Sequence, residues 1–330
     1  MAPPPIPDFA QVQVLVTGGA GFIGSHLVDA LVERGAQVRV LDDFSTGLRS
    51  NLEPSRPEVE VLEGDLRSLR TCLEACDGAR YVFHQGALGS VPRSIQDPAT
   101  SLAVNAGGTA NLFTAARDQG VARLVYASSS SVYGDSETLP KREGEEGSAL
   151  SPYALSKWMC EETAEIFARC YGLESVGLRY FNVFGPRQRP DGPYAAVIPR
   201  FFGAYLSGGR PVIYGDGEQS RDFTFVADAV RANLLAAGAA ASACGRAYTV
   251  AGGRRVSLNE LLRAIRQLLS GGAGPEPSYE DPRPGDVRHS LAELAAIEGG
   301  LGYRPATSVE DGLALTCEYY ASLHAAAATP

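Results

Sequence analysis

The fold of this protein is decided by residues 12–24, which read Val-Gln-Val-Leu-Val-Thr-Gly-Gly-Ala-Gly-Phe-Ile-Gly. The stretch begins with a β-rich apolar run typical of a buried strand, and from Phe22 its apolar residues recur at helical spacing. Gly18, Gly21 and Gly24 lie between and within these elements. A turn without side chains lets the backbone approach a pyrophosphate, and the helix N-terminus offers free N–H groups. The stretch therefore indicates a dinucleotide-binding unit, with an ordinary strand-to-helix turn as the alternative.

The next apolar run ends in an acidic residue. Gln37 to Leu41 alternates apolar β-branched residues, and Asp42 follows directly. An acidic residue about 20 positions beyond the glycines can bind the ribose hydroxyls of adenosine and repel a 2′-phosphate. Asp42 therefore favours NAD over NADP, and the alternative is a solvated loop carboxylate.

The composition limits the class of protein. The chain has 330 residues, a net charge of −9 and 45% hydrophobic residues, which predicts a globular protein of one large domain or two. The negative charge disfavours a nucleic-acid partner. No apolar run reaches the roughly 18 residues of a spanning helix, and the start lacks a secretory pattern, so we expect no membrane partner. Six scattered cysteines suggest free thiols in the cytoplasm, and four distant histidines predict no metal site.

The order of the expected elements predicts the architecture. Apolar runs at 59–66, 81–87 and 124–131 alternate with helical patterns, which indicates an α/β fold with a Rossmann-type doubly wound parallel sheet. Ligands of such sheets bind at the carboxyl ends of the strands. Residues at those ends, all expected on one rim, are Gly18, Asp42, Asp65, Ala87 and Ser129.

The remaining sequence predicts a second, smaller domain. Prolines and glycines become frequent after residue 182, and 183–225 is predicted as a loop-rich lobe. A helix at 225–237 and a strand at 247–250 are expected to rejoin the first domain. We therefore predict a Rossmann domain at 11–182, rejoined by about 225–250. The C-terminal domain is discontinuous, at 183–224 and 251–330.

The segment Ser151-Pro-Tyr-Ala-Leu-Ser-Lys157 predicts the chemistry. Serine is a good N-cap and proline suits the first helical position, so a helix should begin here and end at Gly172. Tyr153 and Lys157 then share one face. A nearby ammonium favours phenolate, so Tyr153 can act as a base beside Ser129. A lone Tyr-x-x-x-Lys is usually an ordinary helix pair, but the preceding dinucleotide fold and serine-ended strand favour the catalytic interpretation.

Together these residues resemble an extended short-chain dehydrogenase/reductase, along nearly the whole chain. Within that family the sequence is most similar to nucleotide-sugar 4-epimerases, especially bacterial UDP-N-acetylglucosamine 4-epimerases. Further stretches that carry the resemblance are His84–Ser94, Arg179–Gly185, Tyr194–Pro199, Gly215–Asp222 and Arg283–Ser290.

The resemblance implies roles for individual residues, NAD as the tightly bound cofactor and a UDP-sugar held by the C-terminal domain. The implied catalytic residues are Ser129, Tyr153 and Lys157. The implied cofactor-binding residues are Gly18, Gly21, Phe22, Ile23, Gly24, Asp42, Asp65, Leu66, Gln85, Ala87, Asn105, Tyr153, Lys157 and Tyr180. The implied substrate-binding residues are Gly89, Ser90, Ser129, Ser130, Asn182, Ala195, Val197, Tyr214, Arg221, Arg283, Asp286 and Ser290.

The resemblance also implies a reaction, the C4 epimerisation of a UDP-hexose through a 4-keto intermediate. Chemistry at C5 needs a carboxylate where this chain has Ser130 and Ser131, so dehydration and decarboxylation are disfavoured. Small residues at 89 and 290 leave room for an N-acetyl group without forbidding UDP-glucose or UDP-galactose.

Two other functions stay open at this point. The stretch Pro186–Asp191 is also similar to UDP-glucuronate 4-epimerases, in which an arginine could meet the 6-carboxylate. A non-catalytic dinucleotide-binding sensor is an alternative of another class. By resemblance we also expect a homodimer, formed through the helices at 103–116 and 155–171. Burial within one chain explains the apolar positions of these helices equally well.

Overall fold

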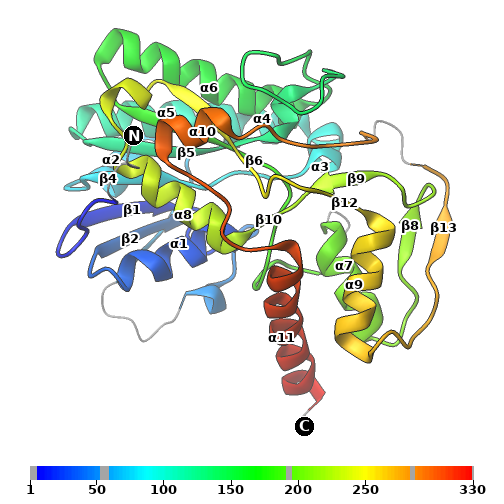
Figure 1. Ribbon diagram of the computed structural model, residues 1–330. Helices are drawn as coiled ribbons and strands as arrows, with labels where there is room; N and C mark the ends of the chain where they lie inside the picture. The colour runs from blue at the N-terminus through cyan, green and yellow to red at the C-terminus, as the bar shows by residue number, and fades with distance from the viewer. Residues whose placement is uncertain (1–5, 53–58, 191–194, 283–286, 329–330) are drawn as a thin grey trace.

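A parallel β-sheet forms the centre of the computed structural model, which describes residues 6–52, 59–190, 195–282 and 287–328. All neighbouring strands of the seven-stranded sheet run parallel (Figure 1). In spatial order the strands are β11 (Arg246–Val250), β6 (Ser175–Tyr180), β5 (Arg123–Ser129), β4 (Tyr81–His84), β1 (Gln13–Thr17), β2 (Gln37–Asp42) and β3 (Val59–Glu63). This confirms the predicted Rossmann-type sheet.

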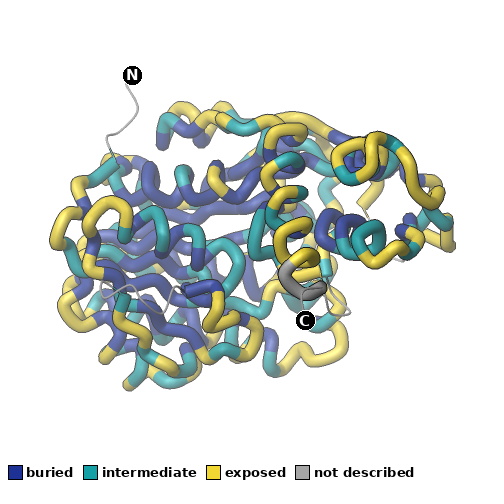
Figure 2. The backbone as a smooth tube through the Cα atoms, turned by 90° about the horizontal axis from the view of Figure 1, so that it is seen from below, coloured by how far each residue is buried: buried dark blue, intermediate teal, exposed yellow. Residues whose placement is uncertain are grey.

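Helices cover both faces of the sheet (Figure 1). Because side chains alternate along a strand, Val14 and Val16 point to one face and Leu15 to the other, and all three are buried. The first face is covered by α1 (Phe22–Val32), α8 (Val226–Ala237) and α10 (Ala295–Leu301). The second is covered by α2 (Leu69–Cys76), α5 (Gly108–Asp118) and α6 (Pro152–Tyr171). Figure 2 shows buried backbone concentrated in this layered body.

The ends of α6 are as the sequence predicts. The hydroxyl of Ser151 accepts a hydrogen bond from the Ala154 amide at 3.1 Å, and Gly172 ends the helix with a φ of 69°. The single helix expected around residue 105 differs, because it is divided. It consists of α4 (Pro98–Leu102), a π-helical turn (Ala103–Gly107) and α5. Such turns are frequent at functional sites.

The second lobe has its own core of phenylalanine, leucine and isoleucine side chains. Its helices are α7 (Val197–Leu206), α9 (Leu258–Ser270) and α11 (Val309–Ala328), so the stretch predicted as loop-rich contains a buried helix. Its strands are β8 (Val212–Tyr214), β9 (Ser220–Asp222), β12 (Arg255–Ser257) and β13 (Ser278–Glu280). The remaining elements are β7 (Val183–Phe184), β10 (Thr224–Phe225), α3 (Val91–Gln96) and 3₁₀ turns at 49–51, 130–133 and 241–243.

The chain topology places the second lobe beside the carboxyl ends of the strands. After β6 the chain enters the second lobe, and β10, α8 and β11 return it to the sheet (Figure 1). A last crossing leads from β13 to α10, and α11 then ends the chain. Within the described residues, no helix has the length and apolar character needed to cross a bilayer.

Candidate active site

The glycine turn after β1 is built by close backbone contacts. Gly18 has a φ of +66°, and a Cβ there would lie 2.6 Å from the Gly86 nitrogen. A Cβ on Gly24 would lie 2.1 Å from the Gly18 oxygen. The N-cap of α1 is Gly21, which has no side chain, and no described side chain caps it. The first N–H groups of α1 are therefore free to meet an anion.

A cavity opens beside this turn, at the carboxyl ends of β1, β2, β3 and β4. Residues predicted to bind the cofactor that line it are Gly18, Gly21, Asp42, Asp65, Leu66, Gln85 and Ala87. Lining residues that sequence reasoning missed include Asp43, Ser45, Thr46, Gly86, Leu88 and Val104. Phe22, Ile23 and Gly24, which were also predicted, form the first turn of α1. A dinucleotide fits this setting, because a glycine turn, a helix N-terminus and a carboxylate lie along one cavity.

Asp42 is held by the backbone around it. Its Oδ2 accepts a hydrogen bond from the Ala20 amide and its Oδ1 from the Phe44 amide, each at 2.9 Å. The residue is 7% exposed, and this burial raises the pKa of its carboxyl group. Each oxygen keeps a lone pair for a ribose hydroxyl. Asp42 is therefore an oriented carboxylate and not a solvated one.

Asp65 and Leu66 follow β3 at the far side of the cavity. Hydrogen bonds from Arg67 lower the pKa of Asp65, and the two side chains approach to 2.5 Å. Leu66 is buried, and its carbonyl accepts a hydrogen bond from Asn111 at 3.0 Å. An apolar side chain next to a fixed carboxylate suits the face and edge of an adenine ring.

Tyr180 supports the cavity from behind. Its hydroxyl lies 2.7 Å from Asn233 Nδ2 and 3.2 Å from Gln85 Nε2, and burial raises its pKa to about 12. Gln85 lines the cavity, whereas the Tyr180 hydroxyl is enclosed by these two amides. The structure therefore assigns Tyr180 to the orientation of Gln85.

Asn105 lies in the π-helical turn and connects two parts of the site. Its Oδ1 accepts from the Leu88 amide at 2.8 Å, while its Nδ2 donates to the Leu88 carbonyl and to the Ser156 hydroxyl. The side chain is buried, and both of its polar atoms are engaged. Asn105 therefore fixes the loop after β4 against α6, which carries Tyr153.

The predicted catalytic residues lie on adjacent elements, because α6 packs against β5 and the turn that follows it. Lys157 is buried and donates to the Ala127 carbonyl at 2.8 Å. Tyr153 is half-buried, and no described residue forms a hydrogen bond with its hydroxyl. Ser129 ends β5, and its Oγ accepts from the Ser131 amide at 3.2 Å. Ser130 begins the 3₁₀ turn that follows.

The backbone of Tyr153 is fixed by two serines that sequence reasoning missed. Its N–H donates to Ser94 Oγ at 3.0 Å, and its carbonyl accepts from Ser156 Oγ at 2.7 Å. Ser94 lies on α3 and is fully buried. Because Ser156 also contacts Asn105, the side chains of these two residues connect the Tyr153 backbone to the loop after β4.

A neutral histidine supports the glycine turn. His84 Nδ1 lies 2.7 Å from Thr17 Oγ1, and its Nε2 lies 2.9 Å from Thr109 Oγ1. Burial lowers its pKa to about 3, with a smaller effect from Lys157. Thr17 Oγ1 also accepts from the Gly86 amide, so His84 orients the turn. Within the described residues, no cluster of histidine, cysteine and carboxylate groups could hold a metal ion.

A buried charged cluster lies behind Ser129. Arg179 of β6 donates to both carboxylate oxygens of Glu161 on α6 and to Glu146 on the loop that precedes α6. Ser128 also donates to Glu161. Burial opposes the charge of Arg179, but the Glu161 hydrogen bonds outweigh it and raise its pKa. The end of β5 is thereby held to the helix of the predicted base.

The predicted substrate residues lie around the second lobe and the loop after β4. Asn182 has a φ of 36° and donates to the Asp222 carbonyl at 2.8 Å. Ser90 caps α3 next to the exposed Gly89. Ala195 and Val197 lie at the start of α7. Arg283 and Asp286 lie outside the described residues.

A second cleft belongs to this lobe. It is lined by Tyr214 together with Gln219, Val287 and Arg288. Arg221 of β9 donates to the carbonyls of Ser220 and Arg288. Ser290, two residues further, donates its amide to the Ser220 carbonyl at 3.0 Å. The structure therefore brings Tyr214, Arg221 and Ser290 to one lobe, and Ser129, Tyr153 and Lys157 to the rim of the sheet.

Comparisons with known proteins agree with this geometry. Residues 14–251 match the family described as NAD dependent epimerase/dehydratase. A putative UDP-glucose 4-epimerase of Methanocaldococcus jannaschii is 37% identical over 303 residues, which cover 91% of this chain and 95% of that relative.

Two solved structures are similar over nearly the whole chain. UDP-glucose 4-epimerase from Thermotoga maritima with UDP-glucose has a TM-score of 0.89 at 37% identity, covering 94% of this chain and 99% of that one. UDP-N-acetylglucosamine 4-epimerase from Methanobrevibacter ruminantium M1, in complex with UDP-N-acetylmuramic acid, has a TM-score of 0.89 at 38% identity, covering 95% and 99%.

The chain belongs to the NAD dependent epimerase/dehydratase family. It is an NAD-dependent enzyme, and the resemblance to extended short-chain dehydrogenase/reductases is confirmed.

Proposed function

We propose that this protein epimerises a UDP-hexose at C4, with UDP-N-acetylglucosamine and UDP-N-acetylgalactosamine as its preferred pair and UDP-glucose and UDP-galactose as further substrates. One observation carries the proposal: the Tyr153–Lys157 helix and the dinucleotide turn lie at the same rim of the sheet. Both solved relatives described above are UDP-sugar 4-epimerases.

The proposed chemistry assigns a step to each residue. Tyr153, as phenolate, removes the proton from the sugar O4 and later returns it, while Lys157 stabilises the phenolate. Ser129 donates a hydrogen bond to the same oxygen. Bound NAD supplies the hydride acceptor for C4 and the hydride for the opposite face. The second lobe keeps the nucleotide anchored while the sugar turns.

The two serines that directly follow Ser129 support epimerisation over related reactions. Ser130 and Ser131 follow Ser129, where chemistry at C5 would need an acid or base. The Ser131 hydroxyl donates to Ser129 Oγ at 3.0 Å, so its role is to orient that residue. We therefore propose that C4 is the only reacting carbon.

The surroundings of the sugar site favour an N-acetylated, uncharged hexose. A Cβ added to Gly89 would meet no described atom within 4 Å, and Ser290 is also small. Arg187, the first arginine of the stretch similar to glucuronate epimerases, pairs with Asp29 of α1 at 2.7 Å. An arginine that already pairs with a carboxylate of the protein binds the 6-carboxylate of a sugar less strongly. UDP-glucuronate is therefore the second candidate substrate.

A direct assay tests the proposed reaction. Purified protein is incubated with UDP-N-acetylglucosamine, UDP-glucose and UDP-glucuronate in separate reactions, and the C4 epimers are quantified. We expect the highest kcat/KM for the N-acetylated pair. Activity on UDP-glucuronate alone would overturn the substrate assignment.

Replacing the base separates an enzyme from a dinucleotide-binding sensor. Tyr153→Phe removes the phenol oxygen, and we expect turnover to fall by at least about 10³-fold while NAD is retained. The matched control is Tyr171→Phe on the same helix, which changes an exposed tyrosine at the far end. Full activity of Tyr153→Phe would refute the assigned base, and inactive wild type with bound NAD would favour the sensor.

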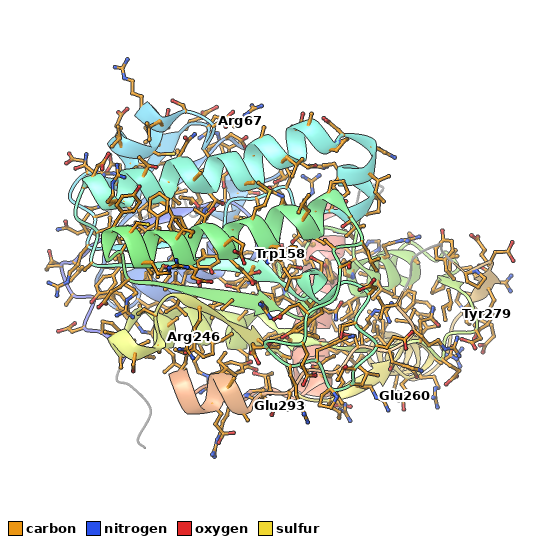
Figure 3. All side chains as sticks on the ribbon, turned by 90° about the horizontal axis from the view of Figure 1, so that it is seen from above. Arg67, Trp158, Arg246, Glu260, Tyr279 and Glu293 are labelled. Atoms are coloured by element: carbon orange, nitrogen blue, oxygen red, sulfur yellow. The ribbon has the colours of Figure 1, made fainter. Side chains whose placement is uncertain are left out.

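We also propose a cytoplasmic homodimer. The six cysteines are free thiols, which suits a reducing compartment. Five large hydrophobic residues of α6 are exposed, namely Leu155, Trp158, Met159, Ile166 and Tyr171, and Trp158 lies on the outer side of this helix (Figure 3). A second copy would cover them. Sedimentation tests the proposed dimer. We expect wild type to sediment as a dimer and Trp158→Glu to weaken that dimer, and a monomeric wild type contradicts the proposal.

A further inference from the structure

One segment of the second lobe crosses back over the carboxyl edge of the sheet. We name residues 287–292 the strap. In Figure 1 it is part of the orange trace that leads from beyond β13 to α10. The strap contributes Val287 and Arg288 to the cleft that contains Tyr214, and it carries Ser290.

Two backbone segments hold the strap at its sides. On β9, the Ser220 amide donates to the Arg288 carbonyl and the Ser290 amide donates back to Ser220, each at 3.0 Å. On the loop before α6, the Lys141 amide donates to the Leu291 carbonyl at 2.8 Å. The strap therefore completes two short ladders, one in each lobe.

A single buried carboxylate joins these ladders to the sheet. Asp222, the last residue of β9, is fully buried. Its Oδ1 accepts hydrogen bonds from the Gly252 and Gly253 amides at 2.9 and 3.0 Å, just after β11. Its Oδ2 accepts from the Ala292 amide at 3.2 Å. One side chain thus connects the end of the sheet with the end of the strap.

The packing around Ala292 explains why this connection matters for the site. Ala292 is 6% exposed and belongs to a small apolar cluster with Tyr133, Phe181 and Ala251. Tyr133 ends the 3₁₀ turn that follows Ser129, Phe181 directly precedes Asn182, and Ala251 directly follows β11. When Ala292 is packed in this apolar cluster, the strap is held at a fixed distance from the rim of the sheet where the sugar would react.

We propose that Asp222 is a positioning residue that locks the strap over the sugar-nucleotide site. The inference rests on the proposed function, since it assumes that the strap contacts the substrate. Asp222 acts through backbone amides and through Ala292, and it takes no part in the chemistry.

The substitution Asp222→Asn tests the lock with little change in volume. An amide has one acceptor oxygen, so it can serve the two glycine amides or Ala292 but not both. The –NH₂ group of the asparagine would then face backbone N–H groups, which are also donors and cannot accept a hydrogen bond from it. We expect the strap to be released. KM for the UDP-sugar and the Kd for UDP should rise about tenfold, with kcat within about twofold, because binding is lost equally in ground and transition states.

The chain offers a matched control in Asp228→Asn. Asp228 is also buried, and its two oxygens accept from the Ala306 and Thr307 amides at 2.8 and 3.0 Å. These amides precede α11 and lie outside the strap. Asp228→Asn loses a comparable hydrogen bond, so it should lower stability to a similar degree without a change in KM.

Hydrogen exchange gives a readout that does not depend on catalysis. Strap amides should exchange at least about tenfold faster in Asp222→Asn than in wild type or Asp228→Asn. If Asp222→Asn does not fold, Ala292→Pro removes the donor from the other side, and the same increases in exchange, UDP Kd and KM are expected.

The outcomes separate this inference from the proposed function. Unchanged strap exchange in Asp222→Asn, or an equal rise of KM in both aspartate variants, would overturn the lock. If wild type epimerises none of the UDP-sugars, the proposed function fails, and UDP affinity with strap exchange still decides whether Asp222 holds the strap.

Discussion

Replacing Arg179 by methionine removes the centre of the buried cluster behind Ser129. Arg179 is 7% exposed, and its Nε and Nη2 donate to the two oxygens of Glu161 at 2.9 and 2.7 Å. Methionine keeps most of the volume but leaves Glu161 with the single donor Ser128. The Glu161 side chain is 10% exposed, so most of it stays shielded from water when the guanidinium is lost.

The expected cost follows from this geometry. Breaking a buried ion pair on one side costs about 3–5 kcal/mol, because the other charge stays buried and uncompensated. Total stabilities are about 5–15 kcal/mol, so Arg179→Met should remove about a fifth or more of the free energy of unfolding. Adding Glu161→Leu removes the stranded charge, and we expect the double variant to regain part of this loss.

Equilibrium urea unfolding of the variants measures the effect. The control is Arg169→Met, because Arg169 pairs with Glu165 on α6 at 3.3 Å while both side chains are more than half exposed. Such a pair is worth about 0.5 kcal/mol or less. Equal costs for the two arginine variants, or a double variant no better than Arg179→Met alone, would refute the reasoning.

Three further predictions concern the turn, the histidine and the substrate. Gly24→Ala places a Cβ 2.1 Å from the Gly18 oxygen, so NAD affinity measured by calorimetry should fall at least about tenfold. The control is Gly299→Ala, which has open space around the added Cβ and should retain NAD affinity. The free energy of unfolding should decrease as pH falls from 6.5 toward 3, by up to about 1.4 kcal/mol per pH unit, because the unfolded chain binds a proton that buried His84 does not. In urea titrations, His84→Gln should reduce this dependence of the unfolding free energy on pH. Arg187→Ala should leave the ratio of kcat/KM between UDP-glucuronate and UDP-hexoses unchanged, and a selective loss for UDP-glucuronate would contradict the assigned ion pair.

Local sequence was sufficient to predict the sheet, the glycine turn and the helix that carries Tyr153. Residues 12–24 specify strand, turn and helix through apolar spacing and glycine, which act within a few residues. The same holds for Ser151 and Gly172, whose capping roles depend on adjacent amides and on a positive φ. These signals do not need the rest of the chain.

The tertiary structure decided which polar groups meet across the chain. Asn105 could serve the cofactor by its position, but packing directs it to Leu88 and Ser156. The sequence allowed an arginine of the stretch 186–191 to meet a substrate carboxylate, and the fold pairs Arg187 of this stretch with Asp29. Asp222 and Ala292 are 70 residues apart in sequence. Hydrogen bonds are short and directional, so such partners are set only when the core has packed and brought distant backbone segments within about 3 Å.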